Sequence, residues 1–518
     1  MQNQIFYYMN QDSLLIIDLG SAYTQLIARQ VRSLQVYCEI YPVHRIPPFQ
    51  SHIKGIILSG ITYSAADISL LIGFLEALPD QIPVLAIGMG SVLLIGEQPK
   101  PNTFYSVGAP IATSQTVIIK NHRLFKHIPQ HTTVWADHEL DLRILPEEFM
   151  AIAHAQDGSI AGFQKAEKPI YGLMFHPEVH QSVHGHQILQ NFVLDICGCQ
   201  QCWTPSNFIV SSIAALKETL GNDKVVLGLS GGVDSTVAAI LLHQAIGQNL
   251  YCIFVNNGLL RKDEFNLVQK SYSAFGLQVK AVDASARFLQ ALSGVSDPEQ
   301  KRKIIGNTFI HVFDEEAHSI QDVVWLAQGT IYPDIIESVS SPDTQVKVKS
   351  HHNVGGLPDF MKLKVVEPLK VLFKDEVRAI GRQLGISSWL IDRHPFPGPG
   401  LAVRILGPVT NEKIRVLQEV DAIFIEKLRS HGLYDKVWQA GAILLPVQSV
   451  GVRNNQRTYE NVVALRAVNS VDGMTAEWAQ LPYDFLLSVS NEILYQVAGV
   501  NRVVYDISSK PPATIEWE

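Results

Sequence analysis

The chain contains a short loop whose residue types suit the binding of a nucleotide. Residues 230–235, Ser-Gly-Gly-Val-Asp-Ser, follow the apolar run 225–229, which predicts a buried strand, and precede 236–243, which predicts a helix. A glycine-rich turn between a strand and a helix directs backbone N–H groups toward an anion at the positive end of the helix dipole. The pattern therefore indicates a phosphate site.

Asp234 indicates which kind of phosphate site the loop could form. No lysine follows the glycines, so the loop lacks the G-x-x-x-x-G-K-S/T spacing of the common phosphate loop. A carboxylate repels phosphate unless a divalent cation lies between them, so the sequence favours a nucleotide with Mg²⁺ and predicts Asp234 as the metal ligand. The alternative is an ordinary loop in which Asp234 or Ser235 caps the helix.

The loop resembles the signature of the ATP pyrophosphatases, which cleave ATP between its α and β phosphates. These enzymes adenylate a carbonyl oxygen, so that a nitrogen or sulfur nucleophile can displace AMP. The resemblance implies that ATP is bound and that the loop holds the pyrophosphate that will leave. The residues expected to bind it are Ser230, Gly231, Gly232, Val233, Asp234, Ser235 and Thr236.

The composition limits the class of protein. A chain of 518 residues is too long for one hydrophobic core, so about three domains are expected. No apolar stretch reaches the roughly 18 residues of a membrane helix, and the N-terminus lacks the pattern of a secretory signal. A net charge of −8 argues against nucleic acid as a partner. Five cysteines are too few for a disulfide scaffold and favour the cytoplasm.

Alternating strands and helices position these residues. The pattern predicts an α/β fold with two doubly wound parallel-sheet domains, followed by a small α+β C-terminal domain. A boundary is expected near Trp203, and a second at the stiff segment 394–400, His-Pro-Phe-Pro-Gly-Pro-Gly. The predicted domains are 1–203, 204–393 and 394–518. The expected strands are 14–18, 35–40, 55–58, 82–87, 116–119, 172–175, 225–229, 251–255, 279–282 and 323–327.

Several longer stretches occur in order with the loop: 299–309, 326–330, 349–353, 394–400 and 505–518. Together they closely resemble the GMP synthetase family over nearly the whole chain. The resemblance implies that ATP adenylates the 2-oxo group of xanthosine monophosphate, and that ammonia then attacks purine C2 to give GMP and AMP. It also implies that the C-terminal domain forms a homodimer.

The same resemblance implies substrate contacts outside the loop. Arg302 would contact the substrate phosphate; the alternative is that the basic run 301–303 is only a solvated helix face. Lys349 would lie in a lid, and Lys510 and Glu516 would reach the substrate from a docked chain end. Asn256 stands where bacterial relatives often have Asp, which would keep hydrogen bonds to the nucleotide but lose a metal contact.

Residues 1–203 resemble class I glutamine amidotransferases, which hydrolyse glutamine with a cysteine, a histidine base and an orienting carboxylate. The base and the carboxylate are matched by His176 and Glu178. The cysteine position, on a strand-to-helix turn, is occupied by Gly88, which has no atom that could attack an amide. Cys38, the nearest alternative thiol, falls in an expected strand.

Further departures surround the same turn. Ile61 replaces a glycine of the oxyanion loop, Ser91 and Val92 replace the usual Met and Gln, and Met174 replaces a polar residue before the histidine. We therefore expect the glutaminase half-reaction to be lost and the ammonia to be external, either free or delivered by a separate glutaminase. The rival hypotheses are another ATP pyrophosphatase and a non-catalytic nucleotide-binding regulator.

Overall fold

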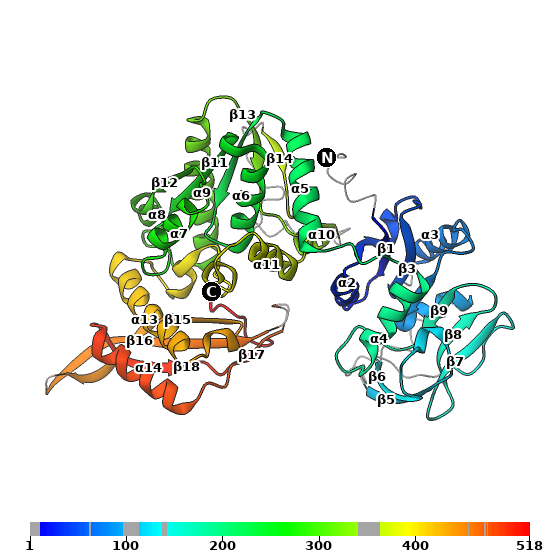
Figure 1. Ribbon diagram of the computed structural model, residues 1–518. Helices are drawn as coiled ribbons and strands as arrows, with labels where there is room; N and C mark the ends of the chain where they lie inside the picture. The colour runs from blue at the N-terminus through cyan, green and yellow to red at the C-terminus, as the bar shows by residue number, and fades with distance from the viewer. Residues whose placement is uncertain are drawn as a thin grey trace. The chain divides into compact units, whose positions relative to one another are not determined.

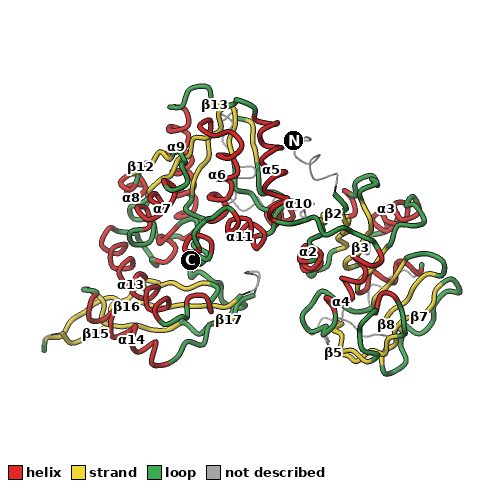
Figure 2. The backbone as a smooth tube through the Cα atoms, viewed as in Figure 1, coloured by secondary structure: helices red, strands yellow, loops and turns green. Residues whose placement is uncertain are grey.

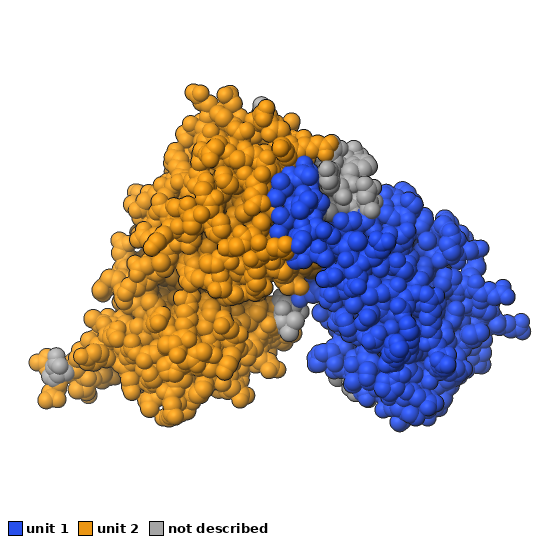
Figure 3. All heavy atoms as spheres, in the orientation of Figure 1, with its two compact units in different colours: residues 1–215, 336–342 blue, residues 216–335, 343–518 orange. Residues whose placement is uncertain are grey.

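The computed structural model describes residues 11–61, 64–96, 113–136, 142–339, 363–453, 455–470, 473 and 475–518. It divides into two compact units, residues 1–215 with 336–342, and residues 216–335 with 343–518 (Figure 3). The α/β fold class is confirmed, whereas the bounds of the three predicted domains stay predictions. No helix in these ranges is long and apolar enough to cross a bilayer.

The first unit contains a nine-stranded sheet in the order β2-β1-β3-β4-β9-β8-β7-β5-β6. Strands β2, β1, β3, β4 and β9 are parallel, as expected, but β9, β8, β7, β5 and β6 pair antiparallel. Only residues 156–159 separate β7 from β8, and so short a link can form a hairpin but not a parallel crossover. The expectation of a wholly parallel sheet is therefore wrong for this half.

Most helices of the first unit lie between its strands in the chain, and the last two follow the final strand (Figures 1 and 2). Its strands are β1 (Ser13–Leu19), β2 (Tyr37–Pro42), β3 (Ile53–Gly60), β4 (Val84–Ile87), β5 (Thr113–Ile119), β6 (His131–Ala136), β7 (Phe149–Ala155), β8 (Ile160–Lys165) and β9 (Ile170–Leu173). Its helices are α2 (Thr24–Ser33), η1 (Val43–Arg45), α3 (Ala65–Glu76), η2 (Gly88–Ile95), η3 (Arg123–Phe125), α4 (Gly185–Gln190) and η4 (Asn191–Ile196), and α5 (Pro205–Leu220) leads to the next unit.

The second unit begins with a five-stranded, wholly parallel sheet in the order β12-β11-β10-β13-β14. Its strands are β10 (Lys224–Leu229), β11 (Leu250–Asn256), β12 (Val279–Asp283), β13 (Val323–Ala327) and β14 (Lys364–Val366). The helices between and after them are α6 (Val233–Ile246), η5 (Gly247–Asn249), α7 (Glu264–Ser273), α8 (Ser285–Ala291), α9 (Pro298–His318), α10 (Tyr332–Val339), α11 (Lys374–Gln383) and α12 (Ser388–Ile391). In such sheets ligands bind beyond the carboxyl ends of the strands.

A second sheet completes this unit, in the order β15-β16-β17 with β18 paired to β16. Its strands β15 (Gln439–Arg453) and β16 (Gln456–Asn469) are longer than the short strands expected here; β17 (Glu477–Trp478) and β18 (Val500–Tyr505) are short. The helices are η6 (Gly400–Arg404), α13 (Asn411–Ser430), η7 (Tyr434–Lys436) and α14 (Tyr483–Gln496). One buried apolar core runs from Val226 and Ile253 to Phe424 and Val489, which joins the two sheets into one unit.

Candidate functional site

The loop 230–235 lies where the sequence predicts it, between β10 and α6. Gly231 has φ of +75°, a left-handed conformation that glycine adopts without strain. Side chains brace the turn from within: Ser235 Oγ donates to the Gly232 carbonyl at 3.2 Å, and buried Thr236 Oγ1 donates to the same carbonyl at 2.8 Å. The first N–H groups of a helix have no partner within that helix. The start of α6 therefore offers donors to an anion.

Asp234 does not cap the helix. The N-cap residue of α6 is Gly232, which makes no side-chain cap, so the alternative of an ordinary loop capped by Asp234 or Ser235 is wrong. One oxygen of Asp234 forms an ion pair with Lys374, at the start of α11. Its other oxygen, Oδ1, is buried and has no hydrogen-bond partner within the described part of the chain. This carboxylate can therefore accept a cation.

The neighbouring strand ends bring further polar groups to the same edge of the sheet. Asn256 ends β11 and donates to Asp283, at the end of β12, over 3.3 Å. Asn256 Oδ1 also accepts the Gly258 N–H at 3.0 Å. Beyond β13, a Cβ on Gly329 would lie 3.4 Å from the nitrogen of Ser235, so this glycine leaves space beside the loop. Asn256 and the loop thus lie at the same edge of the sheet.

The first turn of α9 binds the end of the chain. Lys301 is fully buried and donates to the Ala402 carbonyl at 3.1 Å and the Ile405 carbonyl at 2.7 Å. It also forms an ion pair with the Glu518 carboxylate, and Arg302 donates to the main-chain oxygen of Glu518. The alternative that 301–303 is only a solvated face is therefore wrong for Lys301.

The chain end is docked, as its apolar composition predicts. Arg466 holds it through the carboxylate of Asp506, at 2.7 Å, and through the carbonyls of Ser508, Thr514 and Ile515, at 2.8–2.9 Å. A groove of about 630 Å³ borders this tail. Its lining includes Tyr505, Ile507, Pro512, Thr514, Glu516 and Trp517.

Lys510 and Glu516 both lie in this tail but make different contacts. Lys510 Nζ donates to the Gly473 carbonyl at 2.8 Å. Glu516 is paired with the guanidinium of Arg404 and accepts from Gln439 Nε2 at 3.0 Å. Although burial alone would raise the pKa of Glu516, the charge and hydrogen bonds of Arg404 hold it below its ordinary value. Lys349, the remaining expected contact, lies outside the described residues.

In the first unit, the turn between β4 and η2 carries Gly88 with φ of +67°. A Cβ at this position would lie 2.9 Å from Nε2 of His176. His176 and Glu178 are both buried, and the ring Nδ1 lies 2.7 Å from the Glu178 carboxylate. His176 and Glu178 thus have the geometry expected of a base and its orienting carboxylate. The imidazole faces Gly88, which has no side chain.

The residues that depart from the glutaminase pattern contact one another. Ser91 Oγ donates to the Gly88 carbonyl at 2.6 Å and lies 2.9 Å from the sulfur of Met174. The Gly60 carbonyl oxygen lies so close to Gly90 that a Cβ there would be 2.3 Å from it. An oxyanion requires N–H donors, and this loop presents a carbonyl oxygen to the turn instead.

The cysteines do not supply a replacement nucleophile. Cys38 is buried in β2, which two strands separate from β4, and its thiol lies 3.5 Å from the Ala28 carbonyl. Burial raises the pKa of Cys197 well above its ordinary value and that of Cys199 to about 12, so both are held as thiols. No group of three His, Cys, Asp or Glu side chains suited to a metal occurs among the described residues, which include Cys197, Cys199 and Cys202.

Four charged residues near the expected nucleotide site were not predicted from the sequence: Lys374, Asp283, Arg393 and Arg404. Lys374 is the first residue of α11, and a positive charge is unfavourable at this positive end of the helix dipole. The unfavourable position could have marked Lys374 in the sequence as a candidate functional residue. Arg393 precedes the 394–400 segment and donates to the Gly231 carbonyl at 3.2 Å. No sequence pattern indicated a role for Arg404 or Asp283, because the side chains that they contact across the fold lie far away in the sequence.

Comparisons with known proteins cover the whole chain. Family models match residues 15–196 (Glutamine amidotransferase class-I), 206–307 (NAD synthase) and 426–517 (GMP synthase C terminal domain). A "GMP synthase [glutamine-hydrolyzing]" of Christiangramia forsetii is 58% identical over 511 residues, which cover 98% of this chain and 100% of that one. Those of Flavobacterium psychrophilum and Bacteroides fragilis are each 55% identical, with the same coverage. A relationship of this extent establishes that the chain belongs to the GMP synthase family.

Proposed function

We propose that the chain is a synthetase that uses ATP to activate xanthosine monophosphate and aminates it to GMP. The purine 2-oxo oxygen would attack the α-phosphorus of ATP and release pyrophosphate, and ammonia would then displace AMP from C2. The observation that carries this proposal is the braced loop 230–236 at the carboxyl edge of a parallel sheet, in a chain of this family. Another ATP pyrophosphatase activity is disfavoured by the match of residues 426–517.

Mg²⁺ fits the Asp234 site. This ion keeps several waters and usually takes one or two carboxylates together with substrate phosphates. Asp234 offers one buried, unshared oxygen, and Lys374 supplies a positive charge beside it. Mg²⁺ held there would offset the charge of the leaving pyrophosphate, while the start of α6 donates N–H groups to it.

Other residues would hold the two nucleotides. Asn256 would accept or donate a hydrogen bond at the ATP ribose or adenine, since its amide sits on the same sheet edge as the loop. Arg302 and Lys510 would bind the phosphate of xanthosine monophosphate, and Glu516 would accept from its sugar or base. Lys349 would contribute from the segment outside the described residues.

We also propose that the glutaminase half-reaction is lost. His176 and Glu178 are aligned, but neither can replace the thiolate that must attack the glutamine amide. The contact between Ser91 and Met174 indicates that the pocket has repacked around the missing side chain. Ammonia would then come from solution or from a separate glutaminase, and the enzyme would act in the cytoplasm as a homodimer through its C-terminal domain.

A single set of assays tests both proposals. The purified chain is incubated with ATP, Mg²⁺ and xanthosine monophosphate, and receives either ammonium or glutamine as nitrogen source. We expect AMP and GMP in equal amounts with ammonium, and no glutamate release above background with glutamine. AMP formation that does not depend on xanthosine monophosphate would refute the synthetase proposal, whereas glutamate turnover would refute the loss of glutaminase. No AMP at all would favour a nucleotide-binding regulator.

A further inference from the structure

A buried arginine, Arg404, holds Glu516 by both carboxylate oxygens. Its side chain is 2% exposed, and its Nε and Nη2 donate to the two oxygens at 2.9 and 2.8 Å. A Cβ on Gly441 would lie 2.1 Å from Arg404 Nη1, so the glycine makes room for the guanidinium. A two-pronged contact of this kind fixes the carboxylate in direction as well as in place.

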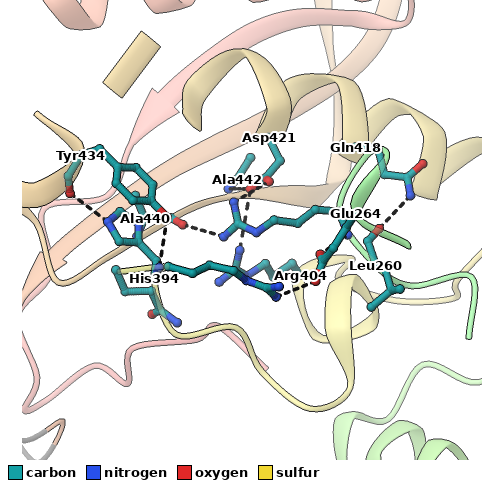
Figure 4. Close-up of polar contacts among 12 residues, drawn as sticks. Leu260, Glu264, His394, Arg404, Gln418, Asp421, Tyr434, Ala440 and Ala442 are labelled. Carbon is teal, nitrogen blue, oxygen red and sulfur yellow. Dashed lines mark hydrogen bonds and ion pairs between the residues drawn. The ribbon is translucent and has the colours of Figure 1, made fainter. Parts of the chain in front are cut away.

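Arg404 is also joined to Asp421 of α13 (Figure 4). Its Nη1 lies 3.7 Å from Asp421 Oδ1, which accepts the Ala442 N–H at 3.2 Å. The other oxygen, Oδ2, accepts from Arg261 Nη1 at 2.8 Å, and Arg261 donates in addition to the Ala440 carbonyl at 3.1 Å. Asp421 thus bridges the buried guanidinium of Arg404 and the partly buried one of Arg261, and it offsets their charge.

Arg261 continues the network to the loop that binds ATP. Its main-chain N–H donates to Glu264 Oε2 at 3.0 Å, and Glu264 Oε1 lies 2.6 Å from Arg393 Nη2. Arg393 donates to the Gly231 carbonyl at 3.2 Å. A chain of hydrogen bonds and ion pairs therefore runs from the glycine turn to Glu516, and its longest link is the 3.7 Å ion pair between Arg404 and Asp421.

The ring of Phe396, in the stiff 394–400 segment, gathers the three arginines. Its centroid lies 5.0 Å from the guanidinium carbon of Arg261, 5.8 Å from that of Arg393 and 5.2 Å from that of Arg404. The faces of an aromatic ring attract cations, so Phe396 helps to hold three like charges around one point.

We propose that Arg404 is a positioning residue for xanthosine monophosphate: it orients Glu516 toward the substrate, and Asp421 and Arg261 tie that carboxylate to the ATP loop. This inference rests on the proposed function, in which Glu516 contacts the substrate. The charged groups that act on Glu516 are Arg404 and Arg261, and the neutral amide of Gln439 donates to it.

The variant Arg404→Lys tests the role most directly. Lysine keeps the charge and loses the two-pronged contact, so we expect KM for xanthosine monophosphate to rise about tenfold while KM for ATP changes less than about twofold. The matched control is Arg382→Lys, whose exposed pair with Asp392 at 2.6 Å lies outside the network and should leave both constants unchanged. Equal changes in the two KM values, or none, would overturn the inference.

A second measurement separates positioning from a merely structural role. In Arg404→Met, Glu516 keeps its burial and loses its main counter-charge, so its pKa rises and the carboxylate takes up a proton as pH falls. Binding of xanthosine monophosphate should then weaken several-fold between pH 8 and 6, whereas wild-type binding stays flat. Arg404→Met/Glu516→Gln should be flat again, because the titrating group is gone. A flat profile in Arg404→Met would count against the proposal.

A double-mutant cycle guards against variants that fold poorly. Glu516→Gln should raise KM for xanthosine monophosphate about as much as Arg404→Lys, and the pair together should raise it no further. Additive effects would mean that the residues act independently and would overturn the inference. A wild-type chain that forms no AMP with xanthosine monophosphate and ammonium would instead refute the proposed function, whatever the variants do.

Discussion

At the residue scale, the chemical role of a residue could be predicted from the sequence wherever that role depends on residues next to it in the chain. The strand, the glycines and Asp234 are contiguous, so both the turn and its carboxylate could be predicted. The ion pair between Asp234 and Lys374 could not be predicted, because these two residues meet only through the order of the parallel strands. The absence of a thiol at Gly88 was visible in the sequence, but its alignment with His176 needed the structure.

The Asp234→Asn variant tests the metal ligand. The amide loses the charge that attracts Mg²⁺, and a loss of about 3 kcal/mol in transition-state stabilisation corresponds to AMP formation about 100-fold slower. Pyrophosphate release with saturating ammonium and xanthosine monophosphate measures the rate. Asp392→Asn, at the surface pair with Arg382, serves as control. A variant with wild-type rate across the Mg²⁺ range would exclude Asp234 as the ligand.

His394 predicts a pH-dependent stability. Its Nδ1 accepts the Ala440 N–H at 3.2 Å, its Nε2 lies 2.9 Å from the Tyr434 carbonyl, and its ring stacks on Tyr434 with centroids 3.8 Å apart (Figure 4). Burial lowers its pKa from 6.5 to about 4, with help from the charges of Arg261 and Arg429 and against the opposing effects of the hydrogen bond with the Tyr434 carbonyl and of Asp435. Protonation would break the bond from Ala440.

The sign follows from proton uptake. Between about pH 6.5 and 4 the unfolded chain binds a proton at His394 that the folded chain does not, so stability is lost as pH falls through this window, by about 3 kcal/mol in total. Urea unfolding of the wild type and of His394→Gln at several pH values measures it. The wild-type advantage should shrink toward low pH, and an advantage that stays constant would contradict the assigned pKa.

At the element scale, the positions of strands and helices along the chain were predicted well. The burial of residues on them and the direction in which the strands pair were predicted less well. The helix that carries the basic run 301–303 is α9, and Lys301 on it is buried rather than solvated. Its partner Glu518 lies 217 positions further along the chain, and periodicity within one helix carries no information about such a partner. The antiparallel half of the first sheet was missed because apolar runs mark a strand but not its direction.

Lys301→Met tests this buried ion pair. Removing the cation leaves the carboxylate of Glu518, 9% exposed, without its partner, which should cost about 3–5 kcal/mol of unfolding free energy. Lys303→Met, two residues away and exposed, should change stability little. Lys301→Met/Glu518→Leu should recover much of the loss in urea unfolding. A single variant as stable as the wild type would show that the pair contributes nothing.

At the scale of the whole molecule, the chain has two compact units, and we expect only the second to be catalytically active. The second holds the nucleotide loop, the docked tail and the network around Arg404 within one core. The first keeps His176 paired with Glu178 beside Gly88, where we propose that the glutaminase nucleophile has been lost. Family membership and fold class could both be predicted from sequence, because their motifs span nearly the whole chain.

His176→Ala tests how little the first unit contributes to chemistry. In a working glutaminase, loss of the base abolishes glutamine-dependent synthesis. Here we expect the rate of GMP formation with ammonium to stay within about twofold of wild type, because no step passes through the imidazole. Glutamine should support no synthesis in either protein. A glutamine-dependent rate that His176→Ala removes would reveal a nucleophile other than residue 88.

The bare turn at Gly88 also bears on inhibition. Electrophilic mimics of glutamine inactivate amidotransferases by alkylating the reactive sulfur, and at this position there is no sulfur to alkylate. A cell that makes its guanine nucleotides with this protein alone would be insensitive to such antimetabolites at this step. Compounds that compete with ATP or with xanthosine monophosphate would remain effective under the proposed function, so the residue at position 88 determines which drug class can act.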